Sequence, residues 1–349
     1  MNLNVPAGEL RFDPVEWSTL LAQPARVEMP LAWAGHIPFA MLLVALLKPR
    51  RLVELGTHSG NSYNAFCQAV DHLGLACRCH AVDTWQGDPQ AGEYGPEIYE
   101  ALRLHQESRY SRFSTLLRMP FDEAAARFEP DSIDLLHIDG LHTYEAVQHD
   151  FETWLPKLSD RAVVLFHDTA VRREEFGVRK FWQELGGRYP SLEFPHCHGL
   201  GVLGVGRNVP PALLRLIDLK GAARGNFLAL IEQLGNRVIV ERELRERESE
   251  IKRLEAALAQ QTREREIETR QLEERTRGLA SQLRAAHQEI DTYRGRLAAA
   301  EVSLGAIFAS RSWRLSRPLR AASRISRRGA RWALHFAARL YTILRPGKR

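Results

Sequence analysis

The sequence predicts an α/β protein in which a doubly wound domain is followed by one long helix and a basic C-terminal segment. Three observations support this prediction. Short β-rich runs alternate with helical patterns up to about residue 206, and the stretch from about residue 237 to residue 310 is proline-free and rich in Glu, Arg, Gln, Leu and Ala. Residues 311–349 contain no Asp or Glu. The 349 residues suffice for one domain of about 200 residues and a further region.

Five runs rich in branched apolar and small residues are expected to form the strands of the sheet, namely residues 51–55, 77–83, 132–139, 162–168 and 199–206. Between the third and fourth runs, apolar residues recur at helical spacing at Tyr144, Val147, Phe151, Trp154 and Leu155. This pattern predicts a helix that packs on the sheet. Residues 1–208 are expected to form the whole domain, with a helical cap at the N-terminus.

The cysteines and the apolar runs indicate the cellular compartment. Four cysteines without a C-x-x-C pair argue against a zinc ribbon or a disulfide scaffold, so we expect free thiols in a reducing compartment. The longest apolar run, residues 37–47, has about half the length that a bilayer span requires. Residues 1–10 lack the features of a signal peptide. We therefore expect a cytoplasmic protein, either free or peripheral on the inner membrane.

The region after the domain is expected to contain a helical linker at residues 209–236 and a coiled coil at residues 237–310. In one seven-residue frame the d positions are Leu244, Ile251, Leu258, Arg265, Leu272, Leu279, Ala286, Tyr293, Ala300 and Ile307. The a positions are polar from Glu248 to Thr276 and apolar from Leu283 to Leu304. We therefore expect a homo-oligomer that associates mainly from about residue 279 onward. A solitary, solvated helix is the alternative.

The last segment, residues 311–349, is the source of the net positive charge. It holds twelve of the 48 Lys and Arg residues, which leaves 36 basic against 43 acidic residues in the rest of the chain. An apolar stripe accompanies this charge at Trp332, Phe336, Leu340, Ile343 and Leu344. The combination predicts binding to an anionic membrane surface, with docking to a partner enzyme as the alternative. Nucleic acid is not expected, because no RNA- or DNA-binding motif accompanies the charge.

The first expected strand leads into a loop that is typical of cofactor binding. Gly56 and Gly60 permit a tight turn before a helix whose first N–H groups point at a ligand. With Glu54 they form E-x-G-x-x-x-G, which favours S-adenosylmethionine over a dinucleotide. Asp83 ends the next strand, where a carboxylate can accept both hydroxyls of a ribose. Helix capping is the alternative role of Asp83.

Acids also end two later strands, at Asp139 and Asp168. If these strands are neighbours, their ends lie about 5 Å apart and both carboxylates can bind one cation. His142 lies three residues after Asp139 and is suited to remove a proton from a hydroxyl that a metal has acidified; a structural role is the alternative. His167 could be a third metal ligand, and His137 is expected in the core.

Residues from about 30 to 206 resemble the class I S-adenosylmethionine-dependent methyltransferases, which have a Rossmann-like fold. The resemblance depends on the VELGTHSGNSY loop, on HIDGLHTYEAV and on a strand that ends in HD. The longer pattern D-G-x-H-x-Y…D…W-x-x-x-L…HD is similar to that of metal-dependent sugar O-methyltransferases of macrolide and surface-polysaccharide biosynthesis.

This resemblance implies roles for individual residues. It implies that S-adenosylmethionine is held by Glu54, Gly56, Gly60, Ser62 and Asp83. It also implies that Asp139 and Asp168 bind Mg²⁺, with His167 as a candidate third ligand, and that His142 is the catalytic base. The metal-dependent relatives usually carry two adjacent acids where this chain has His167 and Asp168.

The expected activity is therefore methyl transfer to a hydroxyl of a sugar or glycan in bacterial cell-surface polysaccharide biosynthesis. Residues 310–320 resemble the S-x-SWR-x-T-x-PLR segment of bacterial glycosyltransferases and methyltransferases that build such polysaccharides. The segment suggests attachment to the inner membrane or to a glycosyltransferase through residues 311–349. Two alternatives remain: a hydroxylase-like reaction on the same fold, and a non-catalytic coiled-coil scaffold of a polysaccharide-synthesis complex.

Overall fold

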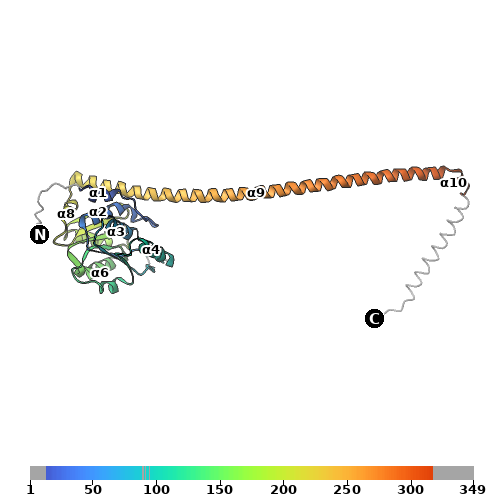
Figure 1. Ribbon diagram of the computed structural model, residues 1–349. Helices are drawn as coiled ribbons and strands as arrows, with labels where there is room; N and C mark the ends of the chain where they lie inside the picture. The colour runs from blue at the N-terminus through green and yellow to red at the C-terminus, as the bar shows by residue number, and fades with distance from the viewer. Residues whose placement is uncertain (1–12, 89, 91, 94, 317–349) are drawn as a thin grey trace, which may run out of the picture. The chain divides into compact units, whose positions relative to one another are not determined.

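The computed structural model describes residues 13–316, except residues 89, 91 and 94. Contacts within the chain define two units, Met1–Ile251 and Lys252–Arg349. Every strand of the described residues belongs to the first unit, and helix α9 (Gly221–Ala309) begins in the first unit and ends in the second (Figure 1).

The first unit is built on a seven-stranded sheet in the order β5-β2-β1-β6-β7-β9-β8. Its strands are β1 (Arg51–Leu55), β2 (Arg78–Asp83), β5 (Ser114–Arg118), β6 (Ile133–Ile138), β7 (Leu158–His167), β8 (Ser191–Phe194) and β9 (Leu200–Gly204). The first five strands in this order are parallel, whereas β9 is antiparallel to both β7 and β8. The predicted Rossmann-like fold is confirmed, and all five expected strands are present. The two strands that the sequence did not reveal, β5 and β8, form the edges of the sheet.

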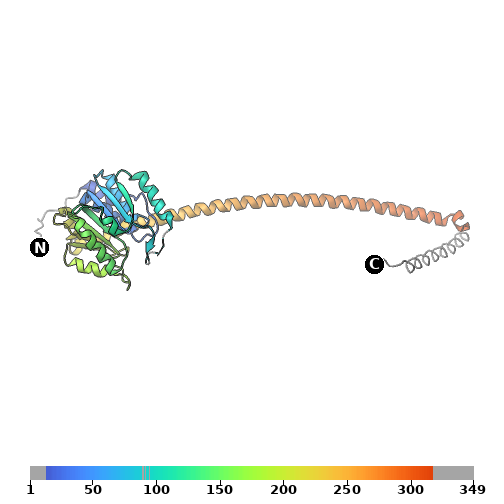
Figure 2. The same cartoon turned by 90° about the horizontal axis from the view of Figure 1, so that it is seen from below.

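Helices cover both faces of this sheet (Figure 2). One face packs against α2 (Ile37–Leu47), α3 (Asn61–His72), α8 (Pro211–Ile217) and the start of α9. The other face packs against α5 (Phe121–Ala125), α6 (Tyr144–Trp154) and α7 (Val178–Gly186). The other described elements are α1 (Pro14–Ser18), α4 (Pro96–Arg109), α10 (Arg311–Leu315), a β3–β4 ribbon (Gly87–Asp88, Gly92–Glu93) and 3-10 turns at Thr19–Leu21, Ala34–His36 and Leu155–Lys157.

Helix α6 shows how the local sequence sets one of these elements. Its N-cap Thr143 accepts a hydrogen bond from the backbone N–H of Ala146 through its side-chain oxygen, at 3.2 Å. Val147, Phe151 and Trp154 are buried on one face of the helix, against the sheet. The predicted helix is therefore confirmed.

Strand register brings the ends of the central strands to one edge. Leu55 of β1 pairs with Ile138 of β6, and Ile138 in turn pairs with Phe166 of β7. Asp139 and Asp168 therefore follow neighbouring strands, as the prediction of a shared site required. In doubly wound folds, ligands bind at this carboxyl edge, where the order of the strands reverses.

The apolar run at residues 37–47 forms the core helix α2, and all eleven of its residues are buried. Among the described residues, no helix is long and apolar enough to cross a membrane. All four cysteines are unpaired, as expected.

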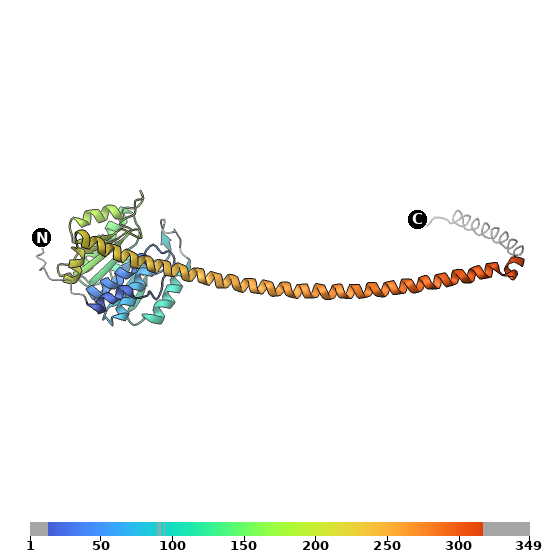
Figure 3. The same cartoon turned by 90° about the horizontal axis from the view of Figure 1, so that it is seen from above.

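Helix α9 begins at Gly221, before the expected start near residue 237. Phe227, Ile231 and Val238 are buried in the core of the first unit, and a Cβ on Gly235 would collide with the backbone of Gly35. Figure 3 shows the first turns of α9 lying along the first unit. The segment expected as a linker, residues 209–236, thus packs as part of the first unit. From residue 252 onward the described side chains of α9 are exposed, and the coiled coil stays a prediction.

The predicted binding segment at residues 311–349 lies largely outside the described residues. Only α10 and Ser316 belong to the described part of it. Its apolar stripe from Trp332 to Leu344 lies entirely outside that part. The predicted membrane or enzyme partner of this segment stays a prediction.

Candidate active site

The glycine loop connects β1 to α3 at the carboxyl edge of the sheet. Gly56 and Gly60 both have φ of +83°, a conformation that a Cβ would strain. A Cβ on Gly56 would also collide with the carbonyl oxygen of Asp139, and one on Gly60 would lie 2.6 Å from the side chain of Leu102. The glycines therefore allow the loop to pack on its neighbours. Gly56 and Ser62 line the site cavity, whereas Gly60 is not among its lining residues.

Asp83 accepts hydrogen bonds from three backbone N–H groups, two of which belong to this loop. Its Oδ2 accepts hydrogen bonds from Thr57 at 2.8 Å and His58 at 2.9 Å, and its Oδ1 accepts one from Trp85 at 2.7 Å. Asp83 is 8% exposed and lines the cavity. A carboxylate offers about four acceptor positions, so one is left for a ligand. The carboxylate thus has room for one ribose hydroxyl beyond its structural bonds, whereas the sequence suggested two.

Glu54 has a different surrounding from the one that the sequence suggested. The Nε1–H of Trp33 donates to His137 Nε2 at 3.2 Å, so the ring proton of His137 lies on Nδ1. That Nδ1–H donates to Glu54 Oε2 at 2.8 Å. Burial raises the pKa of Glu54, whose carboxylate lies behind the cavity lining. Glu54 therefore orients a core histidine and is not among the residues that line the cavity, so its contact with a cofactor stays a prediction. The prediction that His137 is a core residue is confirmed.

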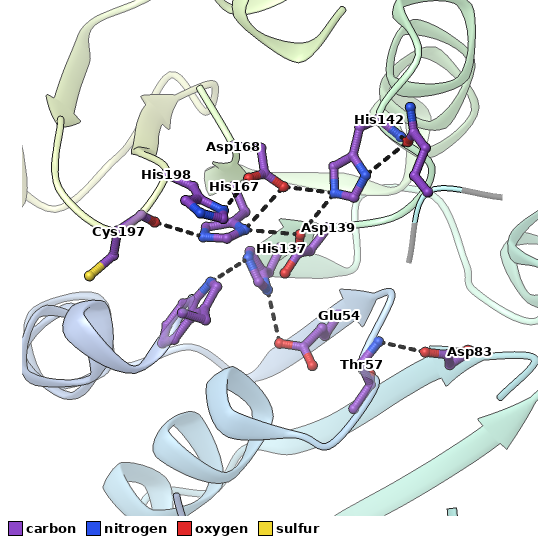
Figure 4. Close-up of polar contacts among 12 residues, drawn as sticks. Glu54, Thr57, Asp83, His137, Asp139, His142, His167, Asp168, Cys197 and His198 are labelled. Atoms are coloured by element: carbon purple, nitrogen blue, oxygen red, sulfur yellow. Dashed lines mark hydrogen bonds and ion pairs between the residues drawn. The ribbon is translucent and has the colours of Figure 1, made fainter. Parts of the chain in front are cut away.

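The predicted acid and histidine residues meet in one cluster (Figure 4). One candidate ligand atom from each of Asp139, His142 and Asp168 lies within 4.8 Å of the others. His142 Nε2 is 2.7 Å from Asp168 Oδ2 and 3.7 Å from Asp139 Oδ1. Two carboxylates and an imidazole form a donor set that suits a divalent cation.

Gln90 fixes the orientation of the His142 ring. Its Oε1 accepts a hydrogen bond from the backbone N–H of His142 at 2.9 Å, and the same oxygen lies 3.0 Å from ring Nδ1. Because an amide oxygen can only accept, Nδ1 is the donor in the second contact. The other ring nitrogen, Nε2, faces the two carboxylates and donates to Asp168 Oδ2, so both ring nitrogens carry a proton in this arrangement. Phe176 stacks on the ring itself, with ring centroids 4.7 Å apart and planes 13° apart. Such support by neighbouring groups is typical of metal ligands and of catalytic bases.

His167 and His198 contact the same acids from the β7 side. His167 Nδ1 lies 3.2 Å from Asp139 Oδ1 and 3.4 Å from Asp168 Oδ2, and its Nε2 lies 3.1 Å from the Cys197 carbonyl oxygen. His198 Nδ1 lies 3.1 Å from Asp168 Oδ1. His167 thus contacts both carboxylates, and its role as a third metal ligand stays a prediction.

Backbone strain marks the same place. Asp168 has φ of +62°, in the left-handed region that non-glycine residues rarely adopt. Such conformations cost about 1–3 kcal/mol and cluster at functional sites. The carboxylate of this residue is the one that lies 2.7 Å from His142 Nε2.

The charges of this cluster depend on one another. Burial lowers the pKa of His142, but its hydrogen bonds to Asp139 and Asp168 outweigh burial and raise that pKa to about 9. Burial raises the pKa of both acids, but the neighbouring histidines hold the pKa of each well below its usual range. A neutral His142, which a base or a metal ligand must be, therefore requires another positive charge between the two carboxylates.

Two contributors to the site were absent from the sequence prediction. His198 belongs to the run His196-Cys197-His198-Gly199. Three consecutive potential metal ligands directly before an expected strand could have identified it as a candidate site residue. Gln90 had no such signal, because it lies in a loop 52 residues from His142.

Residues 53–169 match the family model described as a methyltransferase domain, which agrees with the resemblance seen in the sequence. The chain is also similar to an uncharacterized protein from Sinorhizobium fredii, with 54% identity over 196 residues. That match covers 56% of this chain and 22% of the relative, so the chain matches only about a fifth of the relative's length.

Two of the solved structures that are similar to the chain are O-methyltransferases. An O-methyltransferase from Streptomyces achromogenes, in complex with S-adenosylmethionine, is 16% identical with a TM-score of 0.38, and the match covers 55% of this chain and 95% of that one. An O-methyltransferase from Bacillus cereus, in complex with S-adenosylhomocysteine, is 15% identical with a TM-score of 0.38, over 56% and 92% of the two chains.

Proposed function

We propose that this protein transfers a methyl group from S-adenosylmethionine to a hydroxyl of a sugar or glycan in bacterial cell-surface polysaccharide biosynthesis. The observation that carries the proposal is one cavity of about 450 Å³. Its lining includes the loop residues Gly56 and Ser62 together with Asp83, and also Asp139, His142 and Asp168. A nucleoside cofactor and the groups that activate an acceptor can therefore occupy the same space.

The chain's own residues account for binding of the cofactor. Asp83 offers its remaining acceptor position to a ribose hydroxyl, and the loop from Gly56 to Ser62 supplies the surface on which the cofactor lies. Trp33 and Phe121 add apolar surface to the same cavity. These groups fix the sulfonium methyl relative to the acceptor, and such positioning supplies much of the rate enhancement in a group transfer.

The methyl-transfer step needs an acceptor oxygen and a place for its proton. The oxygen forms a bond to the methyl carbon while the carbon–sulfur bond breaks, so S-adenosylhomocysteine leaves and the hydroxyl proton must be removed. His142 Nε2 faces the carboxylates at the cavity wall and is the base that accepts this proton. Gln90 keeps the ring in the tautomer that can do so. A Mg²⁺ ion held by Asp139 and Asp168 would lower the pKa of the acceptor hydroxyl.

Calorimetry and a transfer assay test this proposal together. We expect S-adenosylmethionine to bind the full chain, and radiolabelled methyl groups to appear on a glycan or nucleotide-sugar acceptor in the presence of Mg²⁺. Failure to bind the cofactor would contradict the whole proposal. Cofactor binding without transfer to any hydroxyl acceptor would contradict the acceptor class, and full activity in EDTA would contradict the role of the metal.

A further inference from the structure

The second unit carries a continuous row of exposed apolar side chains. In the frame defined above, the a and d positions from Leu279 to Ile307 include seven large apolar or aromatic residues that are 47–62% exposed: Leu279, Leu283, Ile290, Tyr293, Leu297, Leu304 and Ile307. Ala286 and Ala300 complete the row. The row extends over four heptads, the length at which a heptad pattern becomes a dependable sign of a coiled coil. A solvated helix has no need of such a row.

Charged residues beside this row specify how two copies fit. Glu289 and Arg296 occupy g positions, and Arg294 and Glu301 occupy the e positions of the heptads that follow. In a parallel, in-register pair, each g position faces the e position of the next heptad on the other helix. Glu289 then faces Arg294 of the second copy, and Arg296 faces Glu301 of the second copy. Both contacts are attractive, and symmetry doubles each of them.

An antiparallel pair cannot use all four charges. It sets g against g and e against e, so the register that joins Glu289 to Arg296 brings Arg294 toward His287. The register that joins Arg294 to Glu301 leaves Glu289 without an opposite charge. The charges therefore favour the parallel arrangement.

The earlier part of α9 does not favour the same pairing. Glu248 and Glu255 occupy a positions and Arg265 occupies a d position, so a parallel pair would set each residue against its own copy. We propose that residues 279–307 join this chain to a further copy of itself in a parallel, in-register coiled coil, and that residues 252–278 add little to the association.

A charge exchange at Arg296 and Glu301 tests the pairing in the full chain. These two positions are five apart and therefore do not face each other within one helix, and no charged residue lies three or four positions from either of them. We expect R296E and E301R each to weaken association by about fivefold to tenfold in sedimentation velocity, because two attractive contacts become repulsive. The double variant R296E/E301R restores attraction and should return to within about twofold of the original affinity.

Cysteine cross-linking tests the orientation. Ala300→Cys, at a d position, should form a disulfide between equivalent residues, whereas Ala298→Cys, at an outward b position, is the matched control and should not. A wild-type sample measures the background from the native thiols, of which three are buried. A chain that stays monomeric, a double charge variant that does not recover, or a dimer in which Ala300→Cys forms no cross-link would each overturn the proposal.

Discussion

The first and later parts of helix α9 have the same regular backbone and opposite surroundings. Near its start, Phe227, Ile231 and Val238 are buried in the core of the first unit. Beyond residue 251, apolar residues such as Ile267 and Leu297 are more than half exposed. Apolar residues on a helix therefore do not by themselves say what will cover them. The first part is covered by its own chain, and for the later part we propose a second copy of the chain.

The candidate site lies in the first unit and uses no residue of helix α9. All residues that line the cavity lie between Pro30 and His198, within the first unit. Chemistry and association should therefore respond to different substitutions. The predictions that follow test this separation, from the largest expected effect to the smallest.

Truncation of a buried residue should affect folding far more than truncation of an exposed one on the same helix. Ile231 is fully buried, so Ile231→Ala should lower the free energy of unfolding by about 2–5 kcal/mol. Ile267, at the outward f position, is 56% exposed, and Ile267→Ala should change it by less than about 0.5 kcal/mol. Denaturant unfolding followed by tryptophan fluorescence measures both. Equal losses would show that the later part of α9 is covered within the single chain.

Removal of the proposed base should reduce turnover without loosening the fold. His142→Ala should lower kcat by about a hundredfold or more, the usual contribution of a general base. Because the contacts of Asp83 stay intact, cofactor affinity should not change. Turnover assays and calorimetry on the same sample separate the two effects, and normal turnover would leave His142 with a structural role.

Replacement of Asp83 should act on the cofactor. Asp83→Asn keeps the size of the side chain but removes the charge, and we expect cofactor binding to weaken by about 1.5–3 kcal/mol. Because the carboxylate also holds Thr57 and His58, a modest fall in melting temperature should accompany this loss. Unchanged cofactor affinity in a folded variant would remove Asp83 from the binding site.

The stability of the first unit should depend on pH through Asp150. Burial raises the pKa of Asp150 to about 7, so the folded chain binds a proton there that the unfolded chain, with a pKa of about 3.9, has released. Stability from this group is complete below the lower pKa and is lost as pH rises toward the higher one. The free energy of unfolding of Asp150→Asn, compared with that of wild type, should therefore rise by about 2 kcal/mol as the pH increases from 5 to 8. Denaturant unfolding of both proteins at pH 5 and pH 8 measures this change. The same difference in free energy of unfolding at both pH values would contradict the expectation.

Removal of the later part of α9 should affect the site least. A chain that ends at Ile251 keeps the whole cavity and the buried residues of α9, so its affinity for S-adenosylmethionine should stay within about twofold of that of the full chain. The same truncation should abolish self-association. A large loss of cofactor affinity would show that the two regions are not separable.

Much of the fold was predictable because its signals are local. Apolar runs identified all five central strands, and the spacing of Val147, Phe151 and Trp154 identified α6. The edge strands β5 and β8 were missed because short, partly exposed strands lack a continuous apolar run. The start of α9 was missed because its first turns have little of the Glu- and Arg-rich composition that identified the rest.

The candidate site, like the fold, was predictable from the sequence only in part. Asp83, Asp139, His142 and Asp168 end or follow strands, and parallel strands place such residues at one edge, so the sequence alone determined that these residues would meet. Only the tertiary structure decided which atoms they face. Glu54 contacts a histidine 83 residues away and Gln90 one that is 52 residues away. Periodicity and strand ends are properties of neighbouring residues, whereas a hydrogen bond between distant side chains depends on the packing of the whole sheet.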